Sequence, residues 1–227
     1  MLTFRILSAL LNYPAPELKS AAGEAMEILR REQVLAGAHL EEVCGLLARI
    51  EAMPQLEAES AYIETFDRGR STSLHLFEHI HGESRDRGQS MVRLLARYRM
   101  HGLELQGSEL PDFLPLFLEF LSTCRPPEAR KYLSEVADII GLIAARLRKR
   151  QSPYAAVLDA VASLAPGEAN DGLRPVNAES EERDDTAAAL DAAWEEAPVT
   201  FNDASLSAAE QELDAAIQGR RAALKGA

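Results

Sequence analysis

Three histidines, three acids and two arginines lie within one short stretch, residues 71–89, between apolar segments. Inside it, His75-Leu76-Phe77-Glu78-His79 has the spacing H-x-x-E-H. On a helix, two imidazoles at this spacing share a face and could hold a zinc ion, with the glutamate as the base for a bound water. One interpretation of this stretch is therefore a zinc metallopeptidase.

That interpretation needs a third protein ligand, and the downstream acids Glu104, Glu109 and Glu119 belong to no second zincin motif. The sequence also has no P-loop, no dinucleotide-binding glycine turn, no nucleophile elbow and no C-x-x-C pair. Two other interpretations stay open: histidines that hydrogen-bond one helix to the next, and histidines on a binding surface. Since no active site is complete, we predict no catalytic residues and no metal, and the zinc metallopeptidase stays the alternative.

Length and composition indicate one globular domain with a tail. The chain has 227 residues, 47% of them hydrophobic, which suffices for one sizeable core. No apolar run approaches the ~20 residues that span a bilayer, and residues 1–7 do not resemble a signal peptide. We therefore expect a cytoplasmic protein without direct membrane insertion. Cys44 and Cys124 lie among apolar neighbours and are expected to be buried free thiols.

The net charge of −12 is concentrated in one part of the chain. Residues 166–198 carry ten acids and two basic residues, a net charge of −8. Residues 1–165 carry twenty-two acids and nineteen basic residues, a net charge of −3. An acidic chain gains nothing from counterion release at phosphates, so we expect no nucleic-acid partner. A basic peptide suits this charge better.

Apolar residues recur at helical spacing throughout residues 2–165, which predicts an all-α fold, a single helical bundle domain. Prolines separate the first helix from the second near residues 12–16, and Met53-Pro54 ends the third. A fourth helix is predicted from Leu56 to Asp67. The very hydrophobic segment 110–121 should be a central helix, with its prolines before or within the first turn.

The charged stretch itself is predicted to be mostly helical. Residues 75–81 should form a short helical segment that Gly82 ends, and Ser84 can cap the next helix, roughly residues 85–100. That helix should turn its arginines, Arg87 among them, toward solvent. The long helix after residue 125 ends in a basic run, residues 146–150, which complements a helix C-terminus.

The chain beyond residue 165 is predicted to be a flexible acidic C-terminal tail. Residues 166–202 are rich in acids and poor in apolar side chains, which predicts a disordered linker. Residues 203–227 have the sparse apolar face of a weak final helix. Trp194 opens the stretch 194–201 and either docks on a partner or packs back on the core.

Several long motifs resemble the NarJ family, the cytoplasmic chaperones that assemble the molybdenum cofactor into respiratory nitrate reductase. In fixed order they are residues 62–68, 74–79, 81–88, 109–112, 114–121 and 194–201, and the resemblance covers essentially residues 1–201. The wider TorD/DmsD group of maturation proteins has a related E-P-D-H loop. Pro111 and Asp112 match that loop, whereas Leu110 and Phe113 replace its Glu and His, and Glu109 lies one position earlier.

The resemblance implies an all-helical chaperone that binds the N-terminal leader of the apo catalytic (alpha) subunit of nitrate reductase. It would hold that subunit open until the molybdenum cofactor is inserted, and delay docking to the membrane subunit. We predict no cofactor for the chaperone itself, and it would not be a stable subunit of the mature enzyme. A pure scaffold between reductase and membrane is an alternative, and it would leave cofactor content unaffected.

The predicted partner-binding residues are aromatic and charged side chains that could converge on one helix-lined groove. Aromatic walls with acids at the edge suit a basic amphipathic helix. The alternative is that these residues only lock neighbouring helices, in which case their substitution lowers stability and binding together. The predicted set is Tyr62, Glu64, Phe66, Asp67, His75, Glu78, His79, Glu83, Arg85, Asp86, Arg87, Glu109 and Asp112.

Overall fold

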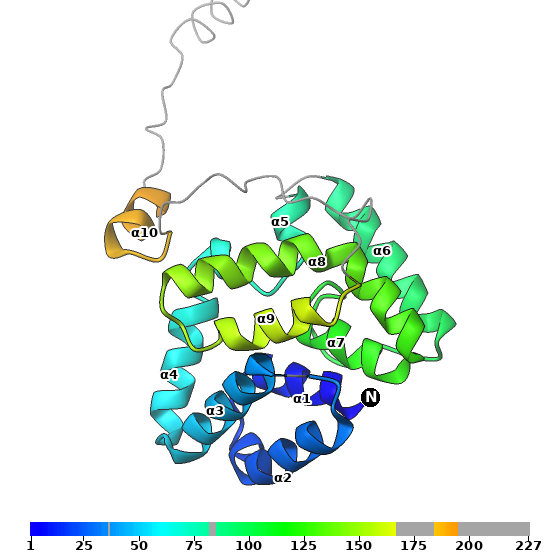
Figure 1. Cartoon of the computed structure of the whole chain (residues 1–227). Helices are drawn as coiled ribbons and strands as arrows, with labels where there is room; N and C mark the ends of the chain where they lie inside the picture. Colours follow the sequence, from blue (N-terminus) through cyan, green and yellow to red (C-terminus); the bar gives the residue numbers. More distant parts are fainter. Residues whose placement is uncertain (36, 82–84, 167–183, 195–227) are drawn as a thin grey trace, which may run out of the picture. The chain divides into compact units, whose positions relative to one another are not determined.

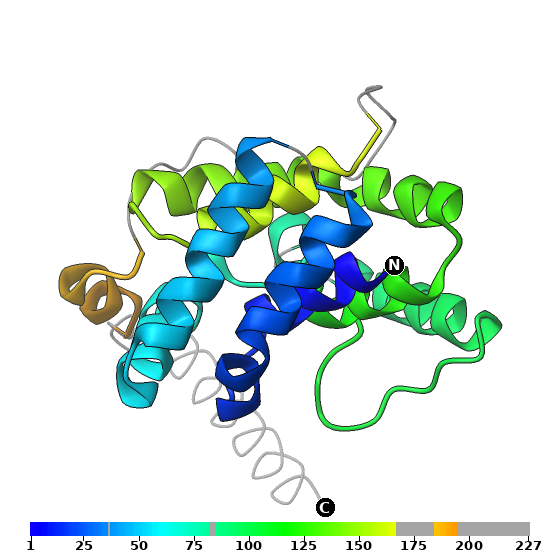
Figure 2. The ribbon, with the colours of Figure 1, turned by 60° about the horizontal axis from the view of Figure 1, so that its bottom comes forward.

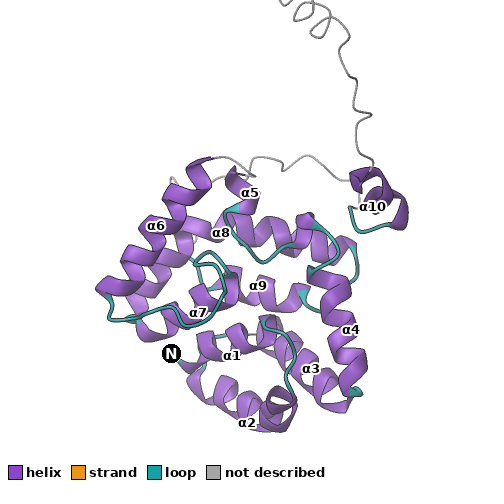
Figure 3. Cartoon of the chain, turned by 180° about the vertical axis from the view of Figure 1, so that it is seen from behind, coloured by secondary structure: helices purple, strands orange, loops and turns teal. Residues whose placement is uncertain are grey.

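The computed structural model describes residues 1–35, 37–81, 85–166 and 184–194 (Figure 1). The chain divides into two compact units, Met1–Thr186 and Ala187–Ala227. Within the described ranges the secondary structure is helical, and the extended pairing is limited to an isolated bridge between His75 and Phe113 (Figure 3). The predicted all-α fold is confirmed.

The helices of the first unit begin and end close to the predicted positions. Proline lies in the first turn of α2, α7 and α8, where its missing N–H leaves no hydrogen bond unmade. The described elements are α1 (Leu2–Leu11), α2 (Pro16–Glu32), α3 (Ala38–Ala52), α4 (Gln55–Phe66), the 3-10 turn η1 (Arg70–Thr72), α5 (Glu78–His81), α6 (Arg85–Met100), α7 (Leu114–Thr123), α8 (Pro126–Lys149) and α9 (Ala155–Ser163).

The core lies where α1 packs on α7, α8 on α9, and α3 on both α2 and α9. Figure 1 shows α8 and α9 side by side, and Figure 2 shows the same for α2 and α3. Helix α7 is buried on most of its surface, with Leu114, Leu118 and Leu121 fully enclosed. The predicted central helix is thus confirmed, and apolar burial on this scale is the main stabilising term of the unit.

Helix α4 packs on the core through the aromatic side chains of its inner face. Tyr62 and Phe66 contact Tyr154, with ring centroids 6.2 and 5.0 Å away, and the Tyr62 hydroxyl donates a hydrogen bond of 3.0 Å to the Leu11 carbonyl. Burial raises the pKa of Tyr62, so this hydroxyl stays protonated and remains a donor. The outer face of α4 is left exposed.

The helix predicted over residues 75–81 is shorter than expected. It begins at Glu78, because His75 forms an antiparallel bridge with Phe113 in the chain before α7. The Leu76 N–H donates to the Asp112 carbonyl at 3.0 Å, and the Leu114 N–H donates to the Leu74 carbonyl at 2.8 Å. Those long-range hydrogen bonds replace the local ones of a helical turn. Gly82 and Ser84, the predicted stop and cap, lie outside the described residues.

The other predictions divide between confirmed and open ones. Cys44 and Cys124 are buried free thiols, as expected. None of the described helices is long and apolar enough to cross a bilayer. The predicted linker, residues 166–202, and the final helix, residues 203–227, lie mostly outside the described residues, so the flexible tail stays a prediction. Within that linker, Asp184–Thr186 are described in the first unit and α10 (Ala187–Trp194) in the second.

Replacing Leu118 with alanine should destabilise the protein strongly. The side chain is fully buried in α7, so Leu118→Ala leaves a cavity and should cost about 3 kcal/mol of unfolding free energy. Leu56→Ala is the matched control, because Leu56 is 73% exposed and the change should stay within about 0.5 kcal/mol. Urea denaturation of both variants measures this. Equal losses would contradict α7 as the centre of the core.

Candidate functional site

A pocket of about 390 Å³ opens where α4 ends and the chain turns through η1 toward α5. Four of the predicted binding residues, Phe66, Asp67, His75 and Glu78, meet there. We call it the α4–α5 pocket; its lining residues are Phe66, Asp67, Arg68, Gly69, Arg70, Ser73, His75 and Glu78. Residues from two motifs of the sequence thus form one surface.

Behind this pocket lies the wholly buried carboxylate of Asp112. It accepts a hydrogen bond of 3.1 Å from the Phe77 N–H, and its other oxygen lies 3.4 Å from Nδ1 of His75. The guanidinium of Arg87 lies 3.7 Å from Asp112 and 3.2 Å from Glu78. A carboxylate buried without such partners would be costly, because it loses its hydrogen bonds to water. Asp112 therefore sets the positions of His75 and Glu78 on the pocket wall.

Arg87 does not face solvent, contrary to the sequence prediction. Its side chain is 20% exposed, because the guanidinium turns inward to the carboxylates of Glu78 and Asp112. Arg97 of the same helix is also drawn in, with a hydrogen bond of 2.8 Å to Glu135 and its guanidinium stacked 4.5 Å above the Tyr132 ring. Helical spacing alone could not reveal these acids, since they come from other elements.

His75 and His79 occupy opposite electrostatic environments. The hydrogen bond to Asp112 raises the pKa of His75, outweighing its partial burial. His79 is buried; its Nε2 lies 2.8 Å from the Ser73 carbonyl, and its Nδ1 lies 3.5 Å from an Arg146 nitrogen. Arginine can only donate, so Nδ1 must accept and Nε2 must carry the proton. Burial lowers the pKa of His79, and the ring is neutral.

The geometry does not assemble the zinc site that the H-x-x-E-H spacing suggested. His75 precedes α5 and faces Asp112, whereas His79 faces Ser73 and Arg146. In the described part of the chain, the possible ligand group that does come together is His101, Cys124 and Glu128. The two histidines of the motif fit the hydrogen-bonding interpretation.

The remaining predicted residues are spread around the pocket or lie away from it. Tyr62 belongs to the aromatic core under α4, and Glu64 is exposed, 3.9 Å from Arg68. Arg85 and Asp86 are exposed at the start of α6, and Glu109 is exposed in the loop before α7. Glu83 lies outside the described residues. The prediction missed Arg68, Gly69, Arg70 and Ser73, which carry no chemical pattern of their own.

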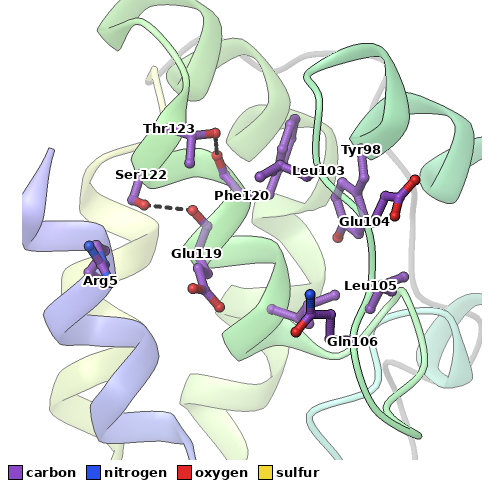
Figure 4. A pocket seen from close by; sticks show the side chains of 11 residues that line it. Arg5, Tyr98, Leu103, Glu104, Leu105, Gln106, Glu119, Phe120, Ser122 and Thr123 are labelled. Carbon is purple, nitrogen blue, oxygen red and sulfur yellow. Dashed lines mark hydrogen bonds between the residues drawn. The ribbon is translucent and has the colours of Figure 1, made fainter.

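A second pocket, of about 410 Å³, lies beside α7 and was not foreseen from the sequence (Figure 4). We call it the α7 pocket. The loop after α6 supplies Leu103, Glu104 and Leu105, and α7 supplies Glu119 and Phe120. Its apolar residues come from the loop after α6 and from α7, which only the fold brings together. Periodicity within one helix therefore gave no sign of this pocket. None of the predicted residues lines it.

Comparison with known proteins agrees with the resemblance seen in the sequence. Residues 17–160 match the family described as nitrate reductase delta subunit. The chain is 44% identical over 201 residues to the nitrate reductase molybdenum cofactor assembly chaperone NarJ of Escherichia coli K12, covering 88% of this chain and 85% of that protein. It is 41% identical to the probable chaperone NarW of the same strain, covering 88% and 84%. It is 33% identical to the probable NarJ of Bacillus subtilis, covering 69% and 84%.

The two histidines should affect stability with opposite pH trends. His75 has a raised pKa, so its stabilisation is complete below the unperturbed imidazole pKa, about 6.5, and fades as pH rises through the raised value. His79 has a lowered pKa, so its stabilisation is complete above about 6.5 and fades as pH falls toward the lowered value.

Substitution by glutamine should reveal this difference in urea denaturation. We expect the destabilisation by His75→Gln to be larger at about pH 5.5 than at about pH 8.5, by ~0.5–1 kcal/mol. His79→Gln should show the reverse order. The two variants control for each other, and a shared pH trend would contradict the assigned environments.

Proposed function

The chain belongs to the nitrate reductase delta subunit family, the family of the NarJ assembly chaperones, and we propose that it binds the N-terminal leader of the apo catalytic subunit of nitrate reductase. It is a chaperone for cofactor assembly and not a catalyst. We further propose that it acts in the cytoplasm, before the reductase docks to its membrane subunit. Binding would keep the reductase open for molybdenum cofactor insertion.

The proposed leader site is based on an exposed stripe along α4 that leads into the α4–α5 pocket. Its four residues are all exposed: Leu56, Ser60, Ile63 and Asp67. Their spacing of four, three and four residues places them on one face of the helix. The stripe thus alternates apolar and polar side chains, and Asp67 belongs to both the stripe and the pocket.

Two further acids lie along the edge of this stripe. Glu57 and Glu64 are exposed, and each follows an apolar residue of the stripe by one position. They are seven residues apart, about two helical turns, so both lie on the same side of the stripe. Together with Asp67 at the end of the stripe, these two acids form an acidic border around Leu56 and Ile63.

An amphipathic helix with basic residues is the partner that fits this surface. Its apolar positions would cover Leu56 and Ile63, which are 73% and 41% exposed, and its cations would lie near the acidic border. The pocket, at about 390 Å³, holds side chains and not a whole helix. It would receive an anchoring side chain at the end of the leader, against the ring of Phe66.

The charges around the pocket would orient the leader more than they would hold it. Asp67 and Glu78 share the lining with Arg68, Arg70 and His75, so the pocket is not uniformly acidic. Arg68 is only loosely paired with Glu64, at 3.9 Å with both side chains more than half exposed. A mixed rim of this kind selects one direction of the helix, because each charge of the leader meets an opposite or a like charge according to its orientation.

Leader binding should weaken when the stripe is altered, with no loss of stability. Ile63→Ser should cost about 1–2 kcal/mol, roughly fivefold to thirtyfold in Kd, because it removes an apolar contact. Asp67→Asn should cost about threefold and reduce the salt dependence of binding. Isothermal titration of the full chain with the leader peptide measures both, alongside thermal melts.

Two variants outside the stripe serve as matched controls, one for the apolar change and one for the acidic change. Val92→Ser removes an exposed aliphatic side chain from α6, and Glu119→Gln removes an acid from the α7 pocket. Both should bind like the parent protein. If Glu119→Gln weakens binding while Ile63→Ser and Asp67→Asn do not, the leader occupies the α7 pocket instead.

Deleting the gene should leave the reductase polypeptide present but without molybdenum cofactor. The reason is that a subunit without its chaperone closes before insertion. Molybdenum content of the purified reductase measures this, and complementation with the Ile63→Ser variant should restore less cofactor than the parent gene. Full cofactor loading in the deletion strain would contradict the insertion role and favour the scaffold alternative.

A further inference from the structure

Asp184, from the acidic segment that follows α9 in the sequence, is seated against the turn between α4 and α5. Its carboxylate accepts a hydrogen bond of 2.7 Å from the Ser71 N–H and one of 2.5 Å from the Ser71 hydroxyl. Arg150 donates a third, of 2.8 Å. Both oxygens of the carboxylate therefore accept hydrogen bonds. Ser71 lies 113 residues before Asp184 in the chain.

Arg150 is the centre of this contact. Its side chain is 9% exposed, and it also donates to the Thr72 and Ser71 hydroxyls at 3.0 and 2.6 Å. A second acid, Asp185, lies 3.4 Å from the same guanidinium and is 7% exposed. An arginine this deeply enclosed requires compensating charge. Both ion pairs described for Arg150 go to this acidic segment.

The electrostatics of Asp184 agree with a specific contact. Burial raises its pKa, yet the hydrogen bonds from Ser71 and the Arg150 guanidinium prevail, and the pKa lies below its usual range. The carboxylate is thus charged at neutral pH, and charge-assisted hydrogen bonds of this kind are stronger than neutral ones. The basic end of α8 does more than complement a helix terminus.

Gly69 shows that the fit is close. A Cβ atom at this position would lie 2.5 Å from Oδ1 of Asp184 and 2.8 Å from its Cγ. The backbone of Gly69 is extended, with φ −140°, a conformation that any residue adopts. A side chain at position 69 would therefore have to displace the Asp184 carboxylate.

The same turn forms a wall of the α4–α5 pocket. Gly69, Arg70 and Ser73 line the pocket, while Ser71 and Thr72 bind the Asp184–Arg150 pair. Asp184 itself does not line the pocket. We propose that Asp184 and Asp185 act as a strap on the cradle formed by Gly69, Ser71, Thr72 and Arg150, fixing the turn and thereby positioning the pocket wall for a peptide. The positioning role rests on the proposed function, whereas the strap does not.

Hydrogen exchange of the full chain without peptide tests the strap. Asp184→Ala should accelerate exchange of the Ser71 amide by about tenfold or more, because its acceptor is removed. Gly69→Ala should do the same in the parent chain, by displacing Asp184. In the Asp184→Ala background, Gly69→Ala should add almost nothing, since the clash no longer exists. Asp191→Ala, which removes an exposed acid from α10, is the matched control and should change nothing.

Peptide titration of the same variants tests the positioning role. Asp184→Ala should weaken leader-peptide binding by about threefold to tenfold, whereas Asp191→Ala should bind like the parent. In the exchange experiment, an equal acceleration of Ser71 exchange by Gly69→Ala in the parent and in the Asp184→Ala background would overturn the strap. Unchanged or tighter binding by Asp184→Ala would overturn positioning. A parent protein that does not bind the peptide would overturn the proposed function and with it positioning, while exchange still decides the strap.

Discussion

The functional half of this protein depends on the interactions of one buried carboxylate, that of Asp112. A carboxylate buried without partners would be costly. Asp112 is therefore surrounded by the Phe77 N–H, the His75 ring and the Arg87 guanidinium. These partners come from the turn before α5 and from α6, and Asp112 itself lies in the chain before α7. One carboxylate therefore ties together segments that apolar packing alone would leave free to slide.

The consequence for function is a surface and not a reaction centre. His75 and Glu78 point into the α4–α5 pocket because their other partners lie behind it, and His79 is used entirely for holding η1 and α8 in place. The histidines that first suggested metal chemistry are thus divided between a binding wall and a structural joint. This division suits a chaperone, whose task is to hold a peptide segment without transforming it.

Asp184, in the acidic segment after α9, has a similar structural role on the other side of the turn. Asp112 fixes the end of the turn that leads into α5, and Asp184 fixes its beginning through Ser71 and Arg150. In both cases a carboxylate organises backbone that makes few helical hydrogen bonds. A short, irregular wall between two helices needs such support if a pocket is to keep one shape.

The sequence by itself determined the features that depend on neighbouring residues. Helical periodicity and the prolines at residues 14–16, 54 and 115 gave the positions of α1 to α4 and α7, and the apolar composition of residues 114–121 gave the central helix. The ordered motifs gave the family. The sequence also indicated a larger set of residues that could share one groove, and Phe66, Asp67, His75 and Glu78 are the members of that set that meet in the α4–α5 pocket.

Only the tertiary structure decided the features that depend on distant partners. Residues 74–76 stay outside the helix because their backbone pairs with the chain before α7, so His75 and His79 do not share a helical face. Arg87 turned inward because Asp112 lies beneath it, and Asp184 reached Ser71 from far along the chain. Local spacing fixes which face of a helix a side chain occupies, but the charge that meets it there is set by the fold.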